Sequence, residues 1–242
     1  MRNASRSSRS IVGRLVRWTL VVVLVLLLLP YLITPLYVFM RPVSTPMVWR
    51  WMTGARVVRT YVPLDAIAPA LPLTVIGSED ARFCRHRGVD WKEVASSIEN
   101  AEELADLRGA STITQQTAKN LFLWQGRSFV RKVLEFPLAL WIDFVLPKRR
   151  VMEIYLNIAE WGPTGEFGAE AAARRAFGVS ARELTDQQAA LLAAVLPNPI
   201  RRSAKQPRPG IRKLAGIYEA RAAASPGLDD CLRKRRRNAG ID

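Results

Sequence analysis

The sequence predicts a mainly α-helical protein with one transmembrane helix near its N-terminus. An uncharged apolar segment runs from Trp18 to Phe39, and later segments repeat apolar residues at spacings of three and four between glycines and prolines. No run of alternating apolar and polar residues predicts a sheet, and no internal repeat is present. With 242 residues, of which 49% are hydrophobic, the chain can bury one substantial core. We therefore expect one folded domain with appendages.

The first expected element is a membrane span over residues 18–40. Its uncharged stretch meets the length needed to cross a hydrocarbon layer about 30 Å thick. Residues 31–37 lack an Ala-x-Ala cleavage pattern, which favours a retained anchor over a cleaved signal peptide. Residues 1–17 carry five arginines and no acidic side chain. The positive-inside rule therefore predicts that these basic residues face the cytoplasm and that the remainder of the chain lies on the outer side.

Residues 41–72 follow the span and contain five prolines, a density that argues against a long helix. We interpret them as a connector with one short extended piece at residues 57–62. The domain proper is expected to cover residues 73–200 and to begin with a helix near Leu73. The helices expected further along the domain, each bounded by glycine or proline, cover residues 111–120, 128–145, 148–159, 168–177 and 185–196.

The net charge of +15 lies mainly at the two ends of the chain. Residues 1–40 carry five basic and no acidic side chains, residues 201–242 carry 12 basic and four acidic ones, and the middle of the chain is nearly neutral. This distribution argues against a nucleic-acid-binding domain. We expect residues 201–242 to form a basic C-terminal tail that is solvated or contacts anionic lipid headgroups.

Cys84 and Cys231 are the only cysteines, and His86 is the only histidine. An exported domain can oxidise two cysteines to a disulfide, but two free thiols are at least as compatible with the sequence. The single histidine and the lack of Cys/His ligand spacing argue against a structural zinc site.

Three polar blocks carry the candidate chemistry. Residues 79–90 begin with two adjacent carboxylates, residues 109–120 combine hydroxyls, carboxamides and a lysine, and residues 127–135 combine basic side chains with one carboxylate. The hydroxyls, carboxamides and lysine of residues 109–120 are poor material for a core. We therefore expect them to form a surface that holds a polar ligand.

Glu79 is the candidate general base. A group transfer to a hydroxyl needs a base for the proton of that hydroxyl, and it needs positive charge to stabilise an anionic departing group. Apolar residues precede Glu79, which places its carboxyl on the floor of a cleft and predicts a raised pKa. A diphosphate departs without a full proton donor once cations neutralise it. The candidate phosphate contacts are Lys119, Arg127, Arg131 and Lys132.

In order and spacing, the three blocks resemble the peptidoglycan glycosyltransferases that polymerise lipid II, and the single-domain layout is similar to that of the monofunctional biosynthetic transglycosylases. The match covers residues 71–200. The resemblance implies a lysozyme-like glycosyltransferase domain on the periplasmic side of the bacterial inner membrane. Glu79 would deprotonate the 4-hydroxyl of GlcNAc in incoming lipid II. That hydroxyl would attack C1 of MurNAc at the end of the growing glycan chain, with release of undecaprenyl pyrophosphate.

The same resemblance implies that Glu79 and Glu135 are the catalytic residues. Glu135 would support the pyrophosphate directly or through a divalent cation, Mg²⁺ or Mn²⁺, although an ion pair that holds neighbouring arginines explains a carboxylate there equally well. No organic cofactor is expected, and His86 is assigned mainly to structure. The residues expected to bind substrate or support its cleft are Asp80, Phe83, His86, Ser111, Thr112, Gln115, Gln116, Lys119, Asn120, Arg127 and Arg131.

Other segments also fit the family. Residues 91–108 have the pattern of an amphipathic surface helix, for which the resemblance implies a mobile flap over the sugar groove. A fourth block contains Glu153, Tyr155 and Asn157, which are expected to bond helix ends and nearby backbone. Neither the Ser-x-x-Lys nor the Lys-Thr-Gly motif of a penicillin-binding domain occurs, so we expect glycan polymerisation without cross-linking.

Two other functions are compatible with the sequence. A lytic transglycosylase or muramidase on the same broad fold would cleave glycan with one acidic residue and would not need the basic residues around Lys119. A non-catalytic membrane scaffold would bind acidic lipid, or a cell-division or wall-synthesis protein, through its basic ends. Incubation with lipid II distinguishes the first alternative, because a polymerase forms glycan polymer whereas a lytic enzyme shortens finished glycan. Replacement of Glu79 distinguishes the second, because it should leave the role of a scaffold unchanged.

Overall fold

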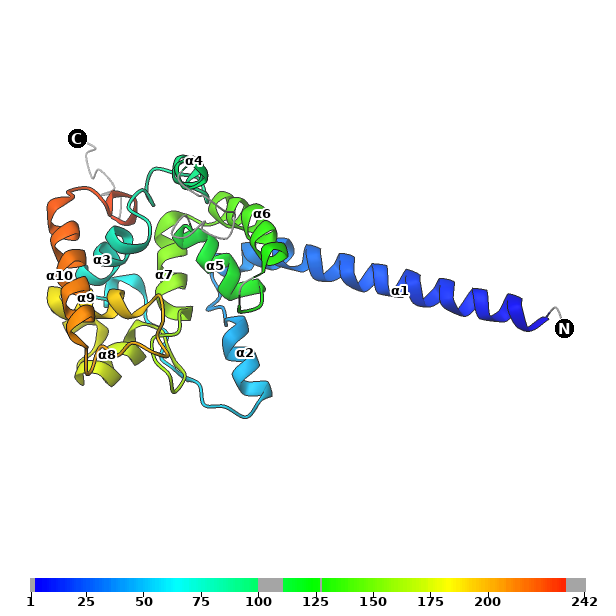
Figure 1. Ribbon diagram of the computed structural model, residues 1–242, viewed down its shortest axis with the longest axis horizontal. Coiled ribbons are helices and arrows are strands. Elements are labelled where there is room, and N and C mark those ends of the chain that lie inside the picture. The colour runs from blue at the N-terminus through cyan, green and yellow to red at the C-terminus, as the bar shows by residue number, and fades with distance from the viewer. Residues whose placement is uncertain (1–2, 100–110, 127, 234–242) are drawn as a thin grey trace, which may run out of the picture.

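Helix α1 (Asn3–Ile33) projects away from the remainder of the chain in the computed structural model (Figure 1). The structure describes residues 3–99, 111–126 and 128–233. From Val12 to Val38 the chain has the length and apolar composition of a membrane span, and only 6% of its most apolar part is buried against the protein. A helix that exposes apolar residues on all sides needs an apolar environment. The structure therefore contains a helix that fits the expected N-terminal anchor.

The base of the anchor is fixed to the domain by polar contacts. The indole Nε1 of Trp141 donates a hydrogen bond to the carbonyl of Tyr31 at 3.1 Å. The guanidinium Nε of Arg150 donates to the carbonyl of Tyr37 at 2.8 Å. These bonds satisfy carbonyls that the end of a helix leaves without intrahelical partners. The span is thus attached directly to the folded domain.

The domain is built almost entirely from helices, as expected. Each of the five helices expected between residues 111 and 196 is present, with ends within two residues of the expected ones. A short parallel pair of strands is the one sheet in the described ranges. The elements after α1 are η1 (Thr34–Val38), α2 (Thr45–Met52), β1 (Val58–Arg59), η2 (Leu64–Ala66), α3 (Ala70–Glu79), α4 (Trp91–Glu99), α5 (Ile113–Phe122), α6 (Phe129–Val145), α7 (Lys148–Ile158), β2 (Glu166–Phe167), α8 (Ala169–Phe177), η4 (Ala181–Glu183), α9 (Asp186–Val195), α10 (Pro209–Ala224) and η5 (Asp230–Leu232).

Helices α3 and α7 lie at the centre of the core. Leu71, Val75 and Ile76 of α3 are fully buried, as are Met152 and Ile154 of α7. Each such side chain contributes roughly 1.5–3 kcal/mol by leaving water. Helix α3 packs against α9 and α10, whereas α7 packs against α5 and α6. The end of α3, at Glu79, therefore lies in a wall to which several helices contribute.

The expected connector is more ordered than its prolines indicate. It contains helix α2, which begins where Ser44 accepts a hydrogen bond from the backbone of Met47, and strand β1 lies within the expected extended piece. Two residues of α7 bind the backbone in the later part of this connector. Asn157 accepts from the backbone of Val62 at 2.9 Å, and Glu153 accepts from the backbone of Leu64 at 3.0 Å. The expectation that these two α7 side chains bond nearby backbone is confirmed.

The folded domain continues past residue 200, which corrects the expected C-terminal tail. Helix α10 packs against α3 and α9 (Figure 1), and Leu232 beyond it is buried in the core. A disulfide joins Cys231 to Cys84. The basic side chains of this region predicted a tail, but those of α10 lie on its solvent side, which is compatible with a folded helix. Residues 234–242 lie outside the described ranges.

Gly88 is expected to be essential for stability. Its φ of +73° suits glycine, and a Cβ there would lie 2.5 Å from the carbonyl oxygen of Ala139. Gly178 has a similar φ of +76°, but a Cβ there would meet nothing within 4 Å, so this position isolates the cost of the backbone conformation. Gly178→Ala is expected to cost about 1 kcal/mol, and Gly88→Ala at least about 3 kcal/mol because backbone must move. Urea unfolding of both variants measures this difference, and equal losses would contradict it.

Candidate active site

Glu79 is the last residue of α3, and its carboxylate is half-buried. The amide Nε2 of Gln116, on α5, donates a hydrogen bond to Glu79 Oε2 at 2.9 Å. A carboxylate removed from water needs such a donor, since an unpaired buried polar group is costly. The bond joins the first polar block to the second.

Tyr155 fixes the orientation of that amide. Tyr155 belongs to α7, and its ring is buried in the core of the domain. Its hydroxyl donates a hydrogen bond to Gln116 Oε1 at 3.0 Å. With Oε1 accepting from a hydroxyl, Nε2 is left to face Glu79. The sequence predicts that Tyr155 bonds a helix end or nearby backbone. This hydrogen bond to a side chain corrects that prediction. Tyr155 thus acts on Glu79 through Gln116.

Asp80 ties the loop after α3 to the start of α5. Its carboxylate accepts a hydrogen bond from His86 Nε2 at 2.9 Å and one from the backbone N–H of Ile113, also at 2.9 Å. Ile113 opens α5, where the helix leaves backbone donors free and favours negative charge. Both Asp80 and His86 are buried. We therefore assign this pair to support of the cleft rather than to substrate contact.

Three residues expected to bind or line the cleft lie in the interior. Thr112 and Gln115 form a capping box at the start of α5, and the Thr112 hydroxyl also donates to the carbonyl of Gly88 at 2.6 Å. Phe83 is fully buried in the core. Side chains without exposed surface cannot touch a substrate. We correct the expectation for Thr112 and Gln115 and assign all three to the framework under the site.

One basic side chain, Lys119, lies near Glu79, and two more lie close to Lys119 on the neighbouring helix α6. Lys119 is one helical turn from Gln116 on the same face of α5, and α6 packs against α5 with Arg131 and Lys132. The ammonium of Lys132 donates to the hydroxyl of Ser111 at 2.6 Å, which links α6 to the start of α5. We call Lys119, Arg131 and Lys132 the cation cluster.

The charges of the site influence one another. Burial raises the pKa of the Glu79 carboxyl, in the direction that the sequence predicted, while the bond from Gln116 and the charge of Lys119 oppose this rise. Burial lowers the pKa of Lys119, and the charge of Arg131 lowers it further. Burial also lowers the pKa of Lys132 to about 8, with Arg131 and Lys119 acting in the same direction. Lys132 is therefore still mainly charged at neutral pH.

Glu135 is buried beneath the cation cluster. Its two carboxylate oxygens contact Arg131 and Lys132, the latter at 3.1 Å. A divalent cation prefers several oxygen ligands, with carboxylates foremost. No group of three or more His, Cys, Asp or Glu side chains suited to a metal occurs in the described part of the chain. These surroundings fit an ion pair that holds two cations and do not fit a protein-built metal site.

The remaining expected site residues are placed less centrally. Asn120 lies one turn beyond Gln116 on α5, and its side-chain oxygen accepts from Gln125 at 3.5 Å. Arg127 lies outside the described residues, and so do residues 100–110 of the expected flap. The described start of that segment, Trp91–Glu99, is helical as expected.

Two residues near Glu79 were missed by the sequence analysis. Arg202, after α9, donates to the carbonyl of Ala194 at 2.8 Å, and Tyr218 of α10 packs near the same turn of α9. The positive charge of Arg202 lowers the pKa of Glu79, and the charge of Glu79 raises the pKa of Tyr218. Neither residue belongs to a polar block. The packing of α9 and α10 on α3, which the sequence did not reveal, brings them to the site.

Removal of the Arg202 charge is expected to raise the pKa of Glu79. Burial already raises this pKa, and Arg202 opposes the rise by stabilising the carboxylate. In Arg202→Gln, the Glu79 side chain should therefore keep its proton to higher pH, as followed by ¹³C NMR titration of its carboxyl carbon. Arg201→Gln removes the same charge from an exposed neighbour and should leave the titration unchanged. Coincident titrations of the two variants would contradict the assignment.

Known proteins match most of this chain. The model of the transglycosylase family matches residues 47–218. A biosynthetic peptidoglycan transglycosylase of Nitrobacter hamburgensis is 59% identical over 215 residues, which cover 89% of this chain and 95% of the relative. A relative with the same name from Rhodopseudomonas palustris is 59% identical over 223 residues, which cover 92% of this chain and 94% of the relative. Another from Agrobacterium fabrum is 54% identical over 211 residues, which cover 86% of this chain and 93% of the relative. The chain therefore belongs to the transglycosylase family and is a peptidoglycan glycosyltransferase of cell-wall synthesis.

Proposed function

We propose that this enzyme polymerises lipid II into glycan strands and releases undecaprenyl pyrophosphate. The observation that carries the proposal is one half-buried carboxylate, Glu79, held by Gln116 beside the cation cluster. Such a pairing offers a proton acceptor next to a site for a leaving anion. Both are needed to join two lipid-linked sugars.

Glu79 acts as the general base in the proposed step. It takes the proton from the 4-hydroxyl of GlcNAc in the acceptor, and the oxygen attacks C1 of MurNAc in the donor. The O4–C1 bond forms as the bond from C1 to the diphosphate oxygen breaks, with inversion at C1. The diphosphate leaves with the electron pair. The raised pKa of Glu79 brings its proton affinity closer to the operating pH, which favours general base catalysis.

The cation cluster stabilises the departing diphosphate. Charge-assisted hydrogen bonds to phosphate are among the stronger ones in proteins, and Arg131 offers a fork of donors whereas Lys119 and Lys132 offer compact charges. The family resemblance assigns the same role to Arg127, which lies outside the described residues. A glycan-cleaving enzyme would instead protonate a poor sugar leaving group and would not need this cluster. The cluster therefore favours synthesis over cleavage.

Glu135 serves to hold the cluster rather than to bind a metal. Both of its oxygens are engaged by Arg131 and Lys132, and this places the two cations on the side of α6 that faces α5. A buried carboxylate with two cationic partners keeps their long side chains in one arrangement. A catalytic role through a divalent cation is not required by this arrangement.

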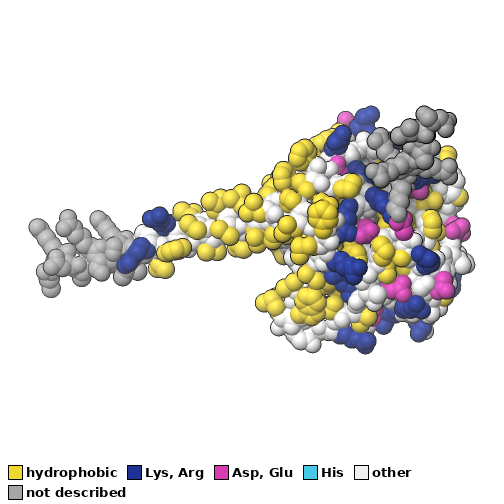
Figure 2. All heavy atoms as spheres, turned by 180° about the vertical axis from the view of Figure 1, so that it is seen from behind, with side chains coloured by type: hydrophobic (Ala, Val, Ile, Leu, Met, Phe, Trp, Pro, Cys, Tyr) yellow, Lys and Arg dark blue, Asp and Glu magenta, His cyan; other side chains and the backbone are white. Residues whose placement is uncertain are grey.

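We infer that the domain works on the periplasmic face of the inner membrane. The arginines of residues 1–17 favour a cytoplasmic N-terminus, and the Cys84–Cys231 disulfide suits an oxidising compartment. Hydrophobic side chains cover the projecting helix and continue onto the adjacent end of the domain (Figure 2). Trp49 of α2 and Phe144 of α6 are among those exposed. Both lipid-linked substrates lie in the same bilayer, so this attachment raises their local concentration.

Incubation with purified lipid II tests the reaction. The wild type is expected to form glycan polymer, and Glu79→Gln is expected to lose at least about 100-fold of the rate because the base is absent. Lys119→Ala should lose about 10-fold to 100-fold through weaker leaving-group stabilisation. Lys213→Ala, which removes an exposed lysine of α10, is the matched control and should retain activity. Shortening of finished glycan without polymer formation would support the lytic alternative and refute the proposal.

Glu135→Gln separates the ion-pair role from the metal role. Loss of the buried charge should misplace Arg131 and Lys132 and lower turnover by about tenfold. The fractional loss should be the same at every Mg²⁺ or Mn²⁺ concentration, including after chelation, because no cation is held by Glu135. Polymerisation rates of wild type and variant across a metal titration measure this. A metal dependence that is present in the wild type and absent from the variant would contradict the ion-pair role.

A further inference from the structure

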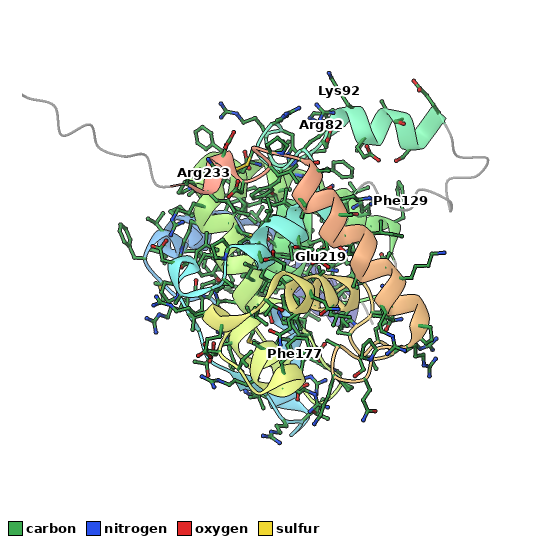
Figure 3. All side chains as sticks on the ribbon, turned by 90° about the vertical axis from the view of Figure 1, so that its left-hand side faces the viewer. Arg82, Lys92, Phe129, Phe177, Glu219 and Arg233 are labelled. Carbon is green, nitrogen blue, oxygen red and sulfur yellow. A yellow bond between two sulfur atoms is a disulfide. The ribbon has the colours of Figure 1, made fainter. Side chains whose placement is uncertain are left out.

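The chain after α10 forms a short segment that the family match does not include. The family model ends at residue 218, within α10, whereas the structure describes the chain to residue 233. We call residues 225–233 the clasp. It turns back from the end of α10, and Figure 3 shows Arg233 at its end, on the same side of the molecule as Arg82. Leu232 of the clasp is 5% exposed and belongs to the main core.

The clasp contacts the helix that carries Glu79. A Cβ at Gly77 would lie 3.7 Å from Leu228 Cδ1 and 3.7 Å from the backbone nitrogen of Ala222. Gly77 is two residues before Glu79. The last turns of α3 are therefore enclosed by the end of α10 and by the clasp, which limit the movement of the helix end.

The clasp is also joined to the loop that follows Glu79. The Cys84–Cys231 disulfide attaches it between Asp80 and His86, the pair that ties this loop to the start of α5. On its other side, Arg149 of α7 donates to the carbonyl of Leu232 at 2.9 Å. The clasp is thus connected to both chain segments that flank Glu79 and to the central helix α7.

The disulfide is the covalent link between the clasp and the loop after Glu79, and the other contacts of the clasp are noncovalent. The regular structure of the clasp is the single short turn η5, Asp230–Leu232, which is too short to be stable alone. Leu228 packs against the core only in part. Reduction of the disulfide would leave noncovalent attachments: the apolar side chains of Leu228 and Leu232, the hydrogen bond from Arg149, and the contacts of the Leu228 carbonyl and the Cys231 backbone N–H with the Cys84 sulfur. The cross-link therefore governs how firmly the clasp holds the loop from Asp80 to His86.

We propose that the clasp is a positioning element for Glu79, and that oxidation of Cys84 and Cys231 switches the enzyme to full turnover. The step joins the two sulfurs and passes two electrons and two protons to a thiol oxidant of the outer compartment, a protein disulfide that is itself reduced to a dithiol. Before export the thiols stay reduced, and the site is held loosely. The effect on turnover rests on the proposed polymerisation of lipid II. The effect on loop mobility does not.

The clasp is expected to act on kcat rather than on KM. Its contacts lie on α3, the following loop and α7, whereas the cation cluster lies on α5 and α6. Loosening of the clasp would disturb the placement of the base while leaving the diphosphate contacts in place. A misplaced catalytic group lowers the rate of the chemical step, so about a tenfold loss of kcat is expected with KM changed by less than about twofold.

The test compares oxidised wild type, reduced wild type and the Cys84→Ser/Cys231→Ser double variant as full-length proteins in detergent. All are assayed on lipid II at a temperature at which circular dichroism shows each to be folded. The reduced wild type and the double variant should show the same loss of kcat, and reoxidation should restore only the wild type. Reductant should not affect the double variant, which controls for other effects of the reagent.

Hydrogen exchange supplies a readout that does not depend on the reaction. Amides of residues 80–88 should exchange faster after reduction, whereas those of residues 117–122, beyond the first turn of α5, should be unchanged. Unchanged kcat together with unchanged exchange would overturn the proposal, as would a loss of kcat that only accompanies unfolding. If the oxidised wild type makes no polymer, the proposed function fails, and the exchange measurement still decides whether the clasp positions the loop.

Discussion

The hydrogen bond between Glu79 and Gln116 is the contact on which the site depends. A carboxylate at the half-buried end of a helix must be paired, yet it must keep enough freedom to accept a proton. One amide donor meets both needs, because it supports the ionised oxygen without the full charge of an ion pair. Tyr155 then sets which end of the amide faces the acid. The buried helix α7 is therefore part of the catalytic arrangement although it contributes no exposed group.

In the cation cluster, a buried carboxylate holds two of the three basic side chains despite the repulsion among them. Burial lowers the pKa values of Lys119 and Lys132, and repulsion among Lys119, Arg131 and Lys132 lowers them further. Glu135 offsets part of this repulsion from below and leaves the cations close together. Such a cluster is well suited to a multiply charged anion that neutralises it on binding. The site therefore stores positive charge where the leaving group develops negative charge.

Much of this arrangement follows from sequence patterns. The apolar spacing predicted the helices from α5 to α9, and the apolar residues before Glu79 indicated its partial burial. The same patterns misassigned Thr112 and Gln115, although Thr-x-x-Gln before a helix is a capping-box signature as well as a set of polar side chains. Their burial in a helix cap could be decided only by the packing of the loop from Asp80 to Gly88 against α5.

The C-terminal part of the domain, residues 201–233, was not predicted to be folded. Its basic composition predicted a tail, whereas Ile211, Leu214 and Tyr218 form an apolar stripe at helical spacing that packs on α9. The pairing of Cys84 with Cys231 could not be read from a separation of 147 residues. The charge of Arg202 acts on Glu79 because α9 and α10 pack against α3. These contacts are tertiary, and no local pattern encodes them.

The most direct measurement of the central claim is a crystal structure of the enzyme with unreactive analogues of both lipid-linked substrates. The acceptor hydroxyl is expected about 3 Å from the Glu79 carboxylate. The donor diphosphate is expected against Lys119 and Arg131, with the anomeric carbon between the two groups. An acceptor hydroxyl without access to Glu79, or a diphosphate bound away from these cations, would contradict the account.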